Sequence, residues 1–506
     1  MDFLTSAAQW KAWAEEFSVL PCIAAQPCAD LPRDWRPFWQ EPYSVLLESA
    51  KAGRYTIVIP RIERFCLGNA TTVSEIIVSG AGRESRRKTL RESPLNVLRN
   101  RLEKSRSPSV PGTPPFCGGW IALLSYDLVR EYEPVPDQSR DDLGLPLYCL
   151  ALGDAGWVVD HEARRLFAFA CRSNVPDPIE VQNEYARARE RVHELMRQWE
   201  AWTSGEVEPL DRDAPETRPA EIPPPSLDEP GYCRAVERIQ EYIRSGDSYQ
   251  VNLSLRESRA LGAPPEAIYE SLRRMNPSPY MGLLRFPGFT VVSGSPELLV
   301  ACHAGRLSAR PIAGTRPRGV AEAEDEALAA ELFGHPKERA EHLMLVDLIR
   351  NDLGRVSRYG TVTVTDFMVR EVYSHVMHIV SHIAGELAPG LSRVDVLRAM
   401  FPGGTITGAP KVRTMQIIDE LEPVRRGYYT GAMGWFGFGG DMELNIIIRT
   451  LLAHGGLAHV QAGAGIVADS VPASEYRESL SKARALWAAM EEADALDPGA
   501  RRRVIS

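Results

Sequence analysis

Hydrophobic and polar positions along this chain follow two periods, and each period predicts one kind of element. Short apolar or alternating runs, bounded by Gly, Pro and small polar residues, indicate β-strands. Apolar positions that recur every three or four residues indicate helices. In the N-terminal part the pattern predicts strands at 43–49, 54–60, 117–127, 157–159 and 166–170, with a hairpin joining the first two, and a helix at 178–202.

The C-terminal part contains more elements of both kinds. Strands are expected at 249–255, 280–286, 289–293, 298–302, 361–365, 375–384, 444–452 and 457–461. Helices are expected at 232–245, 321–332, 337–353, 393–400, 410–421 and 472–490. Since the strands vary in spacing and do not alternate regularly with helices, the pattern predicts an α+β fold with mainly antiparallel sheets.

A change in composition separates these two parts. Residues 203–225 are rich in Pro, Glu, Asp and Thr and end in three consecutive prolines. Such a stretch cannot bury much apolar surface, so it is interpreted as a linker, or as a long loop, between two domains. We therefore expect an N-terminal domain at 1–202, a linker at 203–228 and a C-terminal domain at 229–492.

Composition and charge exclude several classes of protein. The chain has 506 residues, 44% hydrophobic and 25% charged, which is typical of a soluble globular protein of two domains. A net charge of −9 without a Lys/Arg block argues against nucleic-acid binding. Eight scattered cysteines without a C-x-x-C motif favour reduced thiols and a cytoplasmic location. No signal peptide is recognisable, and no apolar run is long enough to span a membrane.

A glycine-rich stretch, Phe401-Pro-Gly-Gly-Thr-Ile-Thr-Gly-Ala-Pro-Lys411, leads into the predicted helix at 410–421. Glycines let a backbone approach a ligand closely, and a helix that begins after such a loop favours an anion at its N-terminus. A nucleotide P-loop is excluded because Ala409 and Pro410 separate the last glycine from the lysine. The remaining alternatives are an anion site and an ordinary loop that caps a packed helix.

Two predicted helices carry carboxylates that suit a hard cation. The helix at 337–353 carries Glu341, and the last helix places Glu475 and Glu478 one turn apart on one face. Carboxylates from two helices could hold Mg²⁺, which uses one or two of them and leaves positions for a substrate. The ordinary alternative is that each belongs to a solvated helix face, with Glu478 paired to Lys482.

Three histidines, His375, His378 and His382, have a spacing that could suggest zinc. On a strand, however, His378 and His382 share a face while His375 points away, and no cysteine nearby completes a ligand set. Zinc is therefore not expected. A neutral histidine on a strand that faces a pocket suits proton transfer, although a buried structural histidine is more common.

Other polar positions lie in strands and turns. Glu297 follows a predicted strand beside a proline turn, a suitable place for a general acid. Arg449 lies inside an otherwise apolar predicted strand, so a partner carboxylate is expected from the protein or from a ligand. Residues 311–318 supply backbone N–H groups and two guanidiniums, and 461–466 form a second glycine loop. Together these features favour an enzyme for a small polyanion with a divalent metal.

Several longer motifs are informative when they are taken together. They are Leu46-Leu-Glu-Ser49, Gly246-Asp-Ser-Tyr-Gln-Val-Asn-Leu253, Asn276-Pro-Ser-Pro-Tyr-Met281, Pro402-Gly-Gly-Thr-Ile-Thr-Gly408, Glu443-Leu-Asn-Ile-Ile-Ile-Arg449 and Glu475-Tyr-Arg-Glu478. This set resembles the chorismate-utilising family, in particular the large subunits of anthranilate synthases and of aminodeoxychorismate (para-aminobenzoate) synthases. The resemblance covers nearly the whole chain. It implies a sandwich of mainly antiparallel sheets flanked by helices, of the anthranilate synthase large-subunit type, with chorismate and Mg²⁺ in a cleft of the C-terminal region.

The resemblance also implies catalytic roles. Glu297 matches the acid that protonates the departing 4-hydroxyl, and His378 matches a histidine needed for pyruvate loss in anthranilate synthases. Thr405 lies in a segment that separates the subfamilies and is a candidate for biasing the outcome. Gln250 stands where family members that add water carry a lysine base, which favours ammonia as the nucleophile.

Binding roles follow from the same resemblance. The residues implied in metal binding are Glu341 and Glu478. Those implied in substrate binding are Gly314, Thr315, Tyr429, Arg449, Gly463, Ala464, Gly465 and Lys482. Those that resemble a tryptophan site are Ser49, Pro279, Tyr280 and Met281.

The motifs divide between the two subfamilies. Those around Ser49 and Tyr280, together with Ala313, resemble anthranilate synthases, whereas those at 246–253, 402–408 and 443–449 resemble the para-aminobenzoate branch, which is the nearer likeness overall. That branch implies amination of chorismate for folate synthesis, with ammonia from a separate glutamine amidotransferase subunit. The alternatives are formation of anthranilate with pyruvate and, from another class, a non-catalytic tryptophan-sensing protein.

Overall fold

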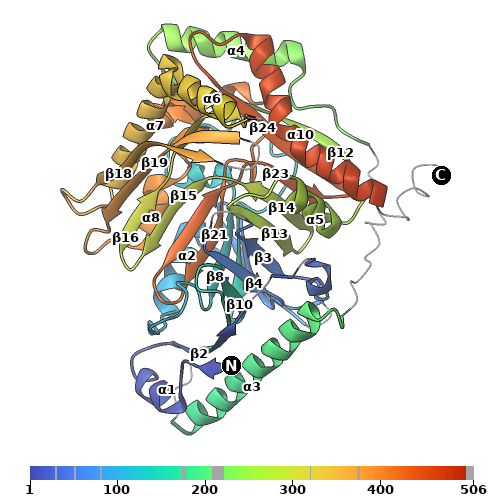
Figure 1. Ribbon diagram of the computed structural model, residues 1–506, viewed down its shortest axis with the longest axis vertical. Helices are drawn as coiled ribbons and strands as arrows, with labels where there is room; N and C mark the ends of the chain where they lie inside the picture. Colours follow the sequence, from blue (N-terminus) through green and yellow to red (C-terminus); the bar gives the residue numbers. More distant parts are fainter. Residues whose placement is uncertain are drawn as a thin grey trace.

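The computed structural model describes residues 1–496 apart from 29–30, 33, 51–52, 80–81, 174–177, 208–220, 320 and 373–375. Two large antiparallel sheets pack face to face, and helices cover their outer surfaces (Figure 1). The first sheet has the strand order β1 (Asp2–Phe3), β2 (Val19–Pro27), β11 (Arg165–Ser173), β10 (Ala155–Asp160), β4 (Tyr55–Ile59), β3 (Val45–Glu48), β13 (Tyr280–Phe286), β14 (Phe289–Ser295), β23 (Thr450–His454), β24 (Leu457–Ile466), β12 (Gln250–Ala260) and β20 (Gly408–Ala409).

The second sheet lies across from the first. Its order is β17 (Ile312–Pro317), β19 (Val376–Glu386), β16 (Arg306–Ala309), β15 (Leu298–His303), β22 (Met442–Ile446), β21 (Ala432–Gly437), β8 (Gly119–Leu124), β9 (Tyr148–Gly153), β5 (Arg64–Gly68), β6 (Val73–Val78) and β7 (Glu84–Leu90), with β18 (Thr363–Val372) paired to β19. The predicted α+β class with antiparallel sheets is confirmed.

Helices complete the fold. They are α1 (Ala7–Trp13), α2 (Pro94–Lys104), α3 (Pro178–Thr203), α4 (Glu229–Arg244), α5 (Pro265–Met275), α6 (Glu322–Gly334), α7 (Pro336–Gly354), α8 (Arg393–Met400), α9 (Lys411–Leu421) and α10 (Pro472–Leu496), with 3₁₀ turns η1 (Arg36–Phe38), η2 (Tyr126–Glu131) and η3 (Gly404–Ile406). Figure 1 shows α1 and α3 at one end of the molecule, and α4, α6 and α7 at the other.

Alternation along the strands explains how one sheet serves two cores. In β11, Phe167 and Phe169 belong to the core between the sheets. Leu166 and Ala168, one position away, face the opposite side and join the core that α3 covers. Because successive side chains of a strand point to opposite faces, a strand buried on both faces reads as a continuous apolar run.

Strands from both parts of the chain pair within both sheets. In the first sheet β3 pairs with β13, where Glu48 lies opposite Met281. In the second sheet β8 pairs with β21. The N- and C-terminal parts therefore share one central core. The division at 1–202, 203–228 and 229–492 stays a prediction, and residues 208–220 of the expected linker lie outside the described part of the chain.

The structure corrects four predicted elements. The glycine loop expected at 461–466 is the C-terminal part of strand β24. The single strand expected at 444–452 is two strands, β22 and β23, which belong to different sheets and are separated by a break where Arg449 has φ +51°. The strand expected at 117–127 ends at Leu124, because Ser125 caps the 3₁₀ turn η2. Pro410, expected as the first helical residue, is the N-cap of α9. Continuous apolar runs hide such breaks, since hydrophobicity does not change where the chain crosses between sheets.

Candidate active site

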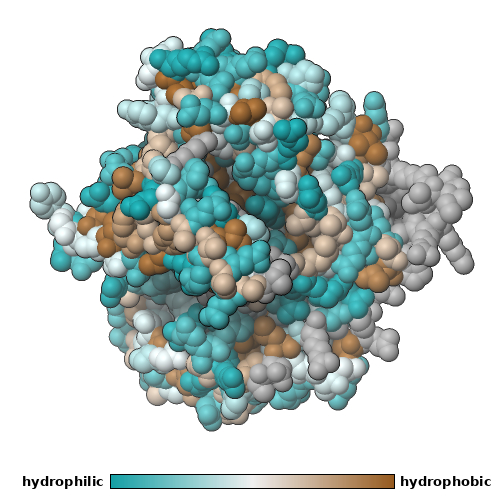
Figure 2. Space-filling view, turned by 45° about the horizontal axis from the view of Figure 1, so that its top comes forward, coloured by the Kyte–Doolittle hydropathy of each residue, from teal (hydrophilic) through white to brown (hydrophobic). Residues whose placement is uncertain are grey.

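A cavity of about 730 Å³ lies where the ends of the two sheets separate. Strands β12 and β24 of the first sheet form one wall, β17 and β19 of the second sheet form another, and α7 and α10 border it. Figure 2, turned so that the end carrying α4 comes forward, shows that this face of the molecule is hollowed. Twelve of the predicted catalytic, substrate-binding and metal-binding residues line the cavity: Gln250, Glu297, Gly314, Glu341, His378, Thr405, Tyr429, Arg449, Gly463, Gly465, Glu478 and Lys482.

The predicted substrate-binding residue Ala464 does not line the cavity with its side chain. Ala464 is fully buried in a different cluster, because it alternates with Gly463 and Gly465 along β24 and faces α4 and α9. Any contact between Ala464 and a ligand would have to come from its backbone. The backbone of Thr315 lies opposite His378 in the register of β17 and β19.

Glu297 follows β14 and is 6% exposed. Burial raises the pKa of its carboxyl to about 7, and the nearby Thr405 hydroxyl opposes that rise. Its backbone is fixed, because Ile446 N–H donates to the Glu297 carbonyl at 3.0 Å. The neutral form of this carboxyl is therefore well populated at pH 7, as a general acid requires.

His378 lies in β19 with its ring held in one orientation. The ring Nδ1 lies 3.0 Å from the Gly314 carbonyl, which can only accept, so Nδ1 carries the proton when the ring is neutral. Burial lowers the pKa of His378, and the Arg449 guanidinium adds to that effect. The histidine is therefore neutral at pH 7. His375 lies outside the described residues, and His382 binds the Thr365 hydroxyl through Nδ1 at 2.6 Å.

Gly314 sits at an irregular position of β17 with φ +65°. A Cβ added there would lie 2.8 Å from Leu332 and 2.9 Å from the carboxylate of Glu338. Both the backbone conformation and the close approach of α6 and α7 therefore require glycine at this position.

Arg449 occupies the turn between β22 and β23. The sequence pattern had placed it in the interior of a strand, and that prediction is wrong. Its guanidinium donates to the Lys482 carbonyl at 3.4 Å, and none of the described carboxylates lies within ion-pairing distance of it. Burial lowers the pKa of Arg449, while Tyr429 and Glu478 oppose that effect. A guanidinium held in a cavity beside Tyr429 suits a carboxylate ligand.

Carboxylates from two helices face the cavity. Glu341 of α7 accepts a hydrogen bond from Gln250 Nε2 at 2.9 Å. Glu478 of α10 forms an ion pair of 2.9 Å with Lys482, so the predicted i, i+4 pair forms, yet both of its members line the cavity. No ready-made cluster of three metal-ligating side chains exists among the described residues. A donor set of separate carboxylates still fits Mg²⁺, which takes one or two of them.

Sequence reasoning left some cavity residues unassigned. Glu338 lines the cavity one helical turn before Glu341, and it accepts from Arg316 at 3.2 Å. Asn252 and Gln461 also line it. The helical spacing of Glu338 and the strand alternation of Asn252 with Gln250 were the signals that could have identified them.

The glycines of the stretch before α9 pack closely against other parts of the chain, and not around an open space for a ligand. A Cβ at Gly404 would collide with Leu348 of α7, and one at Gly408 would collide with the Gln250 carbonyl. Gly408 and Ala409 form β20, which pairs with β12. The stretch contributes Thr405 to the cavity, whereas Lys411 is half-buried and paired with Asp352 at 2.5 Å.

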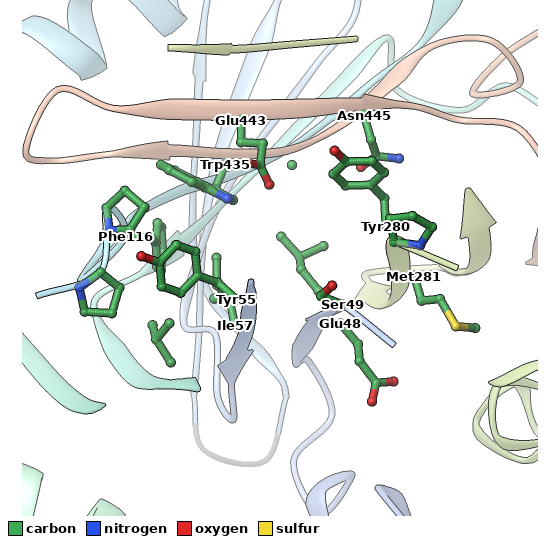
Figure 3. Close-up of a pocket in the computed structure, with 16 residues that line it drawn as sticks. Glu48, Ser49, Tyr55, Ile57, Phe116, Tyr280, Met281, Trp435, Glu443 and Asn445 are labelled. Atoms are coloured by element: carbon green, nitrogen blue, oxygen red, sulfur yellow. The ribbon is translucent and has the colours of Figure 1, made fainter. Parts of the chain in front are cut away.

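A second pocket lies between the sheets and gathers the four tryptophan-site-like residues, Ser49, Pro279, Tyr280 and Met281. Figure 3 shows Ser49 and Tyr280 facing Glu443 and Asn445 of β22. The Glu48 side chain points away from the pocket in the same view, because Arg273 donates to it at 2.8 Å. The pocket is much smaller than the cavity that gathers the predicted catalytic residues.

Comparison with known proteins identifies the family. The model of the chorismate binding enzymes matches residues 45–488. The chain belongs to the chorismate-binding enzymes.

Relatives of this family include members of both branches. The chain is 47% identical to aminodeoxychorismate synthase component 1 of Bacillus subtilis over 456 residues, 89% of this chain and 92% of that protein. It is 38% identical to anthranilate synthase component 1 of Acetivibrio thermocellus over 502 residues, 97% of this chain and 99% of that protein.

A solved structure supports the fold. Anthranilate synthase component I from Streptococcus pneumoniae superimposes with a TM-score of 0.71 at 31% identity, covering 86% of this chain and 92% of that one. The expected anthranilate synthase large-subunit type of fold is confirmed. Within the part of the chain that the structure describes, every helix is too short or too polar to cross a bilayer.

Proposed function

We propose that this chain aminates chorismate at ring position 4 to give 4-amino-4-deoxychorismate, the activity named for its Bacillus subtilis relative. The observation that carries the reaction class is Glu297, a buried carboxyl with a pKa of about 7 on the wall of a polar cavity. The choice of branch rests on the identity to that relative over 89% of this chain. This product would serve para-aminobenzoate and folate synthesis.

Different side chains would bind a carboxylate of the substrate and protonate its 4-hydroxyl. Arg449, Tyr429 and the backbone at Gly463 would bind one carboxylate of chorismate by charge-assisted hydrogen bonds. Glu297 would hold its proton at neutral pH and transfer it to the 4-hydroxyl as that group leaves as water. Gln250, which has no basic atom at neutral pH, would not activate water as a nucleophile.

Glu341 and Glu478 would hold Mg²⁺ together with the second carboxylate of the substrate. The ion would supply positive charge that orients and neutralises that carboxylate. Gln250 and Lys482 support this assignment, since Gln250 holds Glu341 by a hydrogen bond of 2.9 Å and Lys482 holds Glu478 by an ion pair of 2.9 Å at the cavity wall.

Ammonia would come from a second component. The names of the relatives describe component 1 of an enzyme, which implies a further component, and a glutamine amidotransferase is the chemistry that releases ammonia from glutamine. The chain alone would use free ammonium, best at alkaline pH where more NH₃ is present. Glutamine-dependent turnover by the purified chain alone would contradict this.

Product identification tests the proposal. The purified chain would be incubated with chorismate, ammonium and Mg²⁺, and the product treated with aminodeoxychorismate lyase. We expect para-aminobenzoate as the main final product. Ala313→Lys, which places an amine on the cavity wall, should keep or sharpen that preference.

A second candidate, formation of anthranilate with loss of pyruvate, is favoured by the pocket that gathers Ser49 and Tyr280. These residues resemble the tryptophan-binding elements of anthranilate synthases, enzymes that act in tryptophan synthesis. Anthranilate as the direct main product, with inhibition by micromolar tryptophan, would establish this alternative and contradict the first.

A further inference from the structure

A further cavity lies at the end of the second sheet that is remote from the catalytic residues. Its free volume is about 420 Å³, within the range of about 300–1,000 Å³ that is usual for small-molecule sites. It is bordered by α2, by the segment that leads into α8 and by the turn between β21 and β22, and we call it the α2–α8 cavity. His378 near the start of β19 lines the catalytic cavity, whereas Leu387, just after the end of the same strand, lines this one. An extended strand of that length spans about 30 Å, so the two cavities are separate sites.

The interior of the α2–α8 cavity is apolar. Leu102, Val394 and Phe438 line it, and all three belong to one buried hydrophobic core. Leu391 also lines it but is 38% exposed. The core therefore reaches the surface at this point, where an apolar group of a ligand would be stabilised by covering it.

Arginines supply the polar part of the lining. Arg99, Arg106 and Arg393 line the cavity, together with one carboxylate, Glu103. The charge of Arg99 is balanced, because its guanidinium pairs with Asp395 at 2.9 Å. Arg106 lies near an aromatic ring but forms no ion pair with a carboxylate in the described part of the chain. Two of the three arginines therefore differ from Arg99, since Arg393 has no such pair among the described residues either.

Arg393 is held by backbone carbonyls. Its Nη1 donates to the Gly437 carbonyl at 2.6 Å and to the Asp441 carbonyl at 3.2 Å. Its Nε and Nη2 meet no acceptor among the residues described, so they remain available to a ligand. Burial lowers the pKa of Arg393, while Cys302 and Asp441 oppose that effect. A guanidinium that loses water without gaining a partner carboxylate favours an anionic ligand.

Arg106 is anchored beside the same turn. The N–H of the next residue, Ser107, donates to the Phe438 carbonyl at 3.0 Å, and Phe438 directly follows the glycine that Arg393 binds. Arg106 is exposed, so its long side chain can adjust to a ligand bound at Arg393. Both positive charges therefore belong to one end of the cavity.

These features together select one class of ligand. An inorganic anion would leave the apolar interior uncovered, and a neutral apolar molecule would leave both arginines unpaired. We propose that the α2–α8 cavity binds a small carboxylate with an apolar or aromatic body. The carboxylate accepts hydrogen bonds from Arg393 and is stabilised by the charge of Arg106, and the body packs against Phe438 and Leu391. This site does not depend on the proposed function.

Calorimetric titration of the full chain with benzoate tests the site. Arg106→Gln should raise the Kd for benzoate about three- to fivefold, the range of an exposed ion pair. Glu103→Gln should lower that Kd about twofold or more, because it removes a negative charge that repels the carboxylate, and a folding defect would not tighten binding. Lys104→Gln is the matched control: Lys104 is exposed and changes the net charge equally, but it does not line the cavity, so the Kd should stay unchanged.

Acetate tests the apolar half of the site. It has the carboxylate without the body, so it should bind at least about tenfold more weakly than benzoate. Leu391→Asn should raise the Kd for benzoate about threefold and leave that for acetate unchanged. Thermal unfolding of each variant establishes that it is folded, as expected for substitutions at exposed positions.

The variants also separate this site from binding elsewhere. None of the four substituted residues lines the catalytic cavity, so benzoate bound there contributes equally in every chain. Identical titrations of the wild type and of Arg106→Gln would overturn the site, and so would equal effects of Arg106→Gln and Lys104→Gln. Acetate that binds as tightly as benzoate would also overturn it, because the cavity would then hold an adventitious ion only.

Discussion

Glu422 and Arg426 form an ion pair that is almost completely buried, with 2.7 Å between Arg426 Nη2 and Glu422 Oε1. Arg426 also donates to the carbonyls of Ile406 at 2.9 Å and Asn252 at 2.7 Å. The pair therefore holds the loop that carries Thr405 against strand β12, although neither partner lines the cavity itself.

Glu422→Gln should destabilise the fold by about 3–5 kcal/mol, because it leaves a buried guanidinium without a counter-charge. Chemical denaturation measures the loss. Glu241→Gln is the control: it makes the same change in the exposed pair between Arg238 and Glu241, where less than about 1 kcal/mol is expected. Equal losses in the two variants would contradict the role of burial.

Glu297→Gln should lower kcat by about 10²–10⁴-fold, since the amide cannot supply the proton of a general acid. In the wild-type chain the acid form is populated below its pKa of about 7, so kcat at constant free NH₃ should fall as pH rises through 7. Thr405→Val should move this inflection to higher pH, because Thr405 opposes the rise of the pKa. A pH–rate profile without an inflection near 7 in the wild type would contradict the assignment.

Removal of either proposed metal ligand should reduce activity without unfolding. Glu341→Gln and Glu478→Gln each remove a hard oxygen ligand, and the loss of one charge-assisted contact costs about 1.5–3 kcal/mol. Steady-state kinetics against Mg²⁺ concentration measures the effect. Asp347→Asn, on the exposed face of α7, is the control and should behave as wild type. Near-normal turnover in EDTA would refute the metal site.

Glu270 should make stability depend on pH. Burial raises the pKa of its carboxyl to about 7 in the folded chain, above the ordinary value of 4.5, although Trp35 N–H donates to it at 2.8 Å. The folded state therefore binds the proton more tightly, and stability falls as pH rises from about 4.5 through 7.

Glu270→Gln, which cannot ionise, should leave stability nearly unchanged at pH 4.5 and increase it by up to about 3 kcal/mol at pH 8. Denaturation of wild type and variant at the two pH values gives the difference. Glu190→Gln, on the exposed surface of α3, should show no such pH dependence. A stabilisation that is equal at both pH values would count against titration of Glu270.

Part of this protein follows from local pattern alone. The strand at Tyr280–Phe286 and the helix at Arg393–Met400 have the bounds that their apolar spacing predicts. Candidate site residues were also recognisable as separate motifs, because a motif is a property of neighbouring residues. The sequence thus determined the α+β class, the main elements and the residue types of the site.

Only the tertiary structure decided how these pieces meet. The run at 444–452 is apolar throughout, so nothing local marks the point at Arg449 where the chain leaves one sheet for the other. The meeting of Gln250 with Glu341, and of Ser254 with Glu422, depends on contacts between residues more than ninety positions apart. The pKa of Glu297 likewise depends on burial in the folded chain. Burial and the direction of hydrogen bonds are properties of the packed chain, and no local pattern contains them.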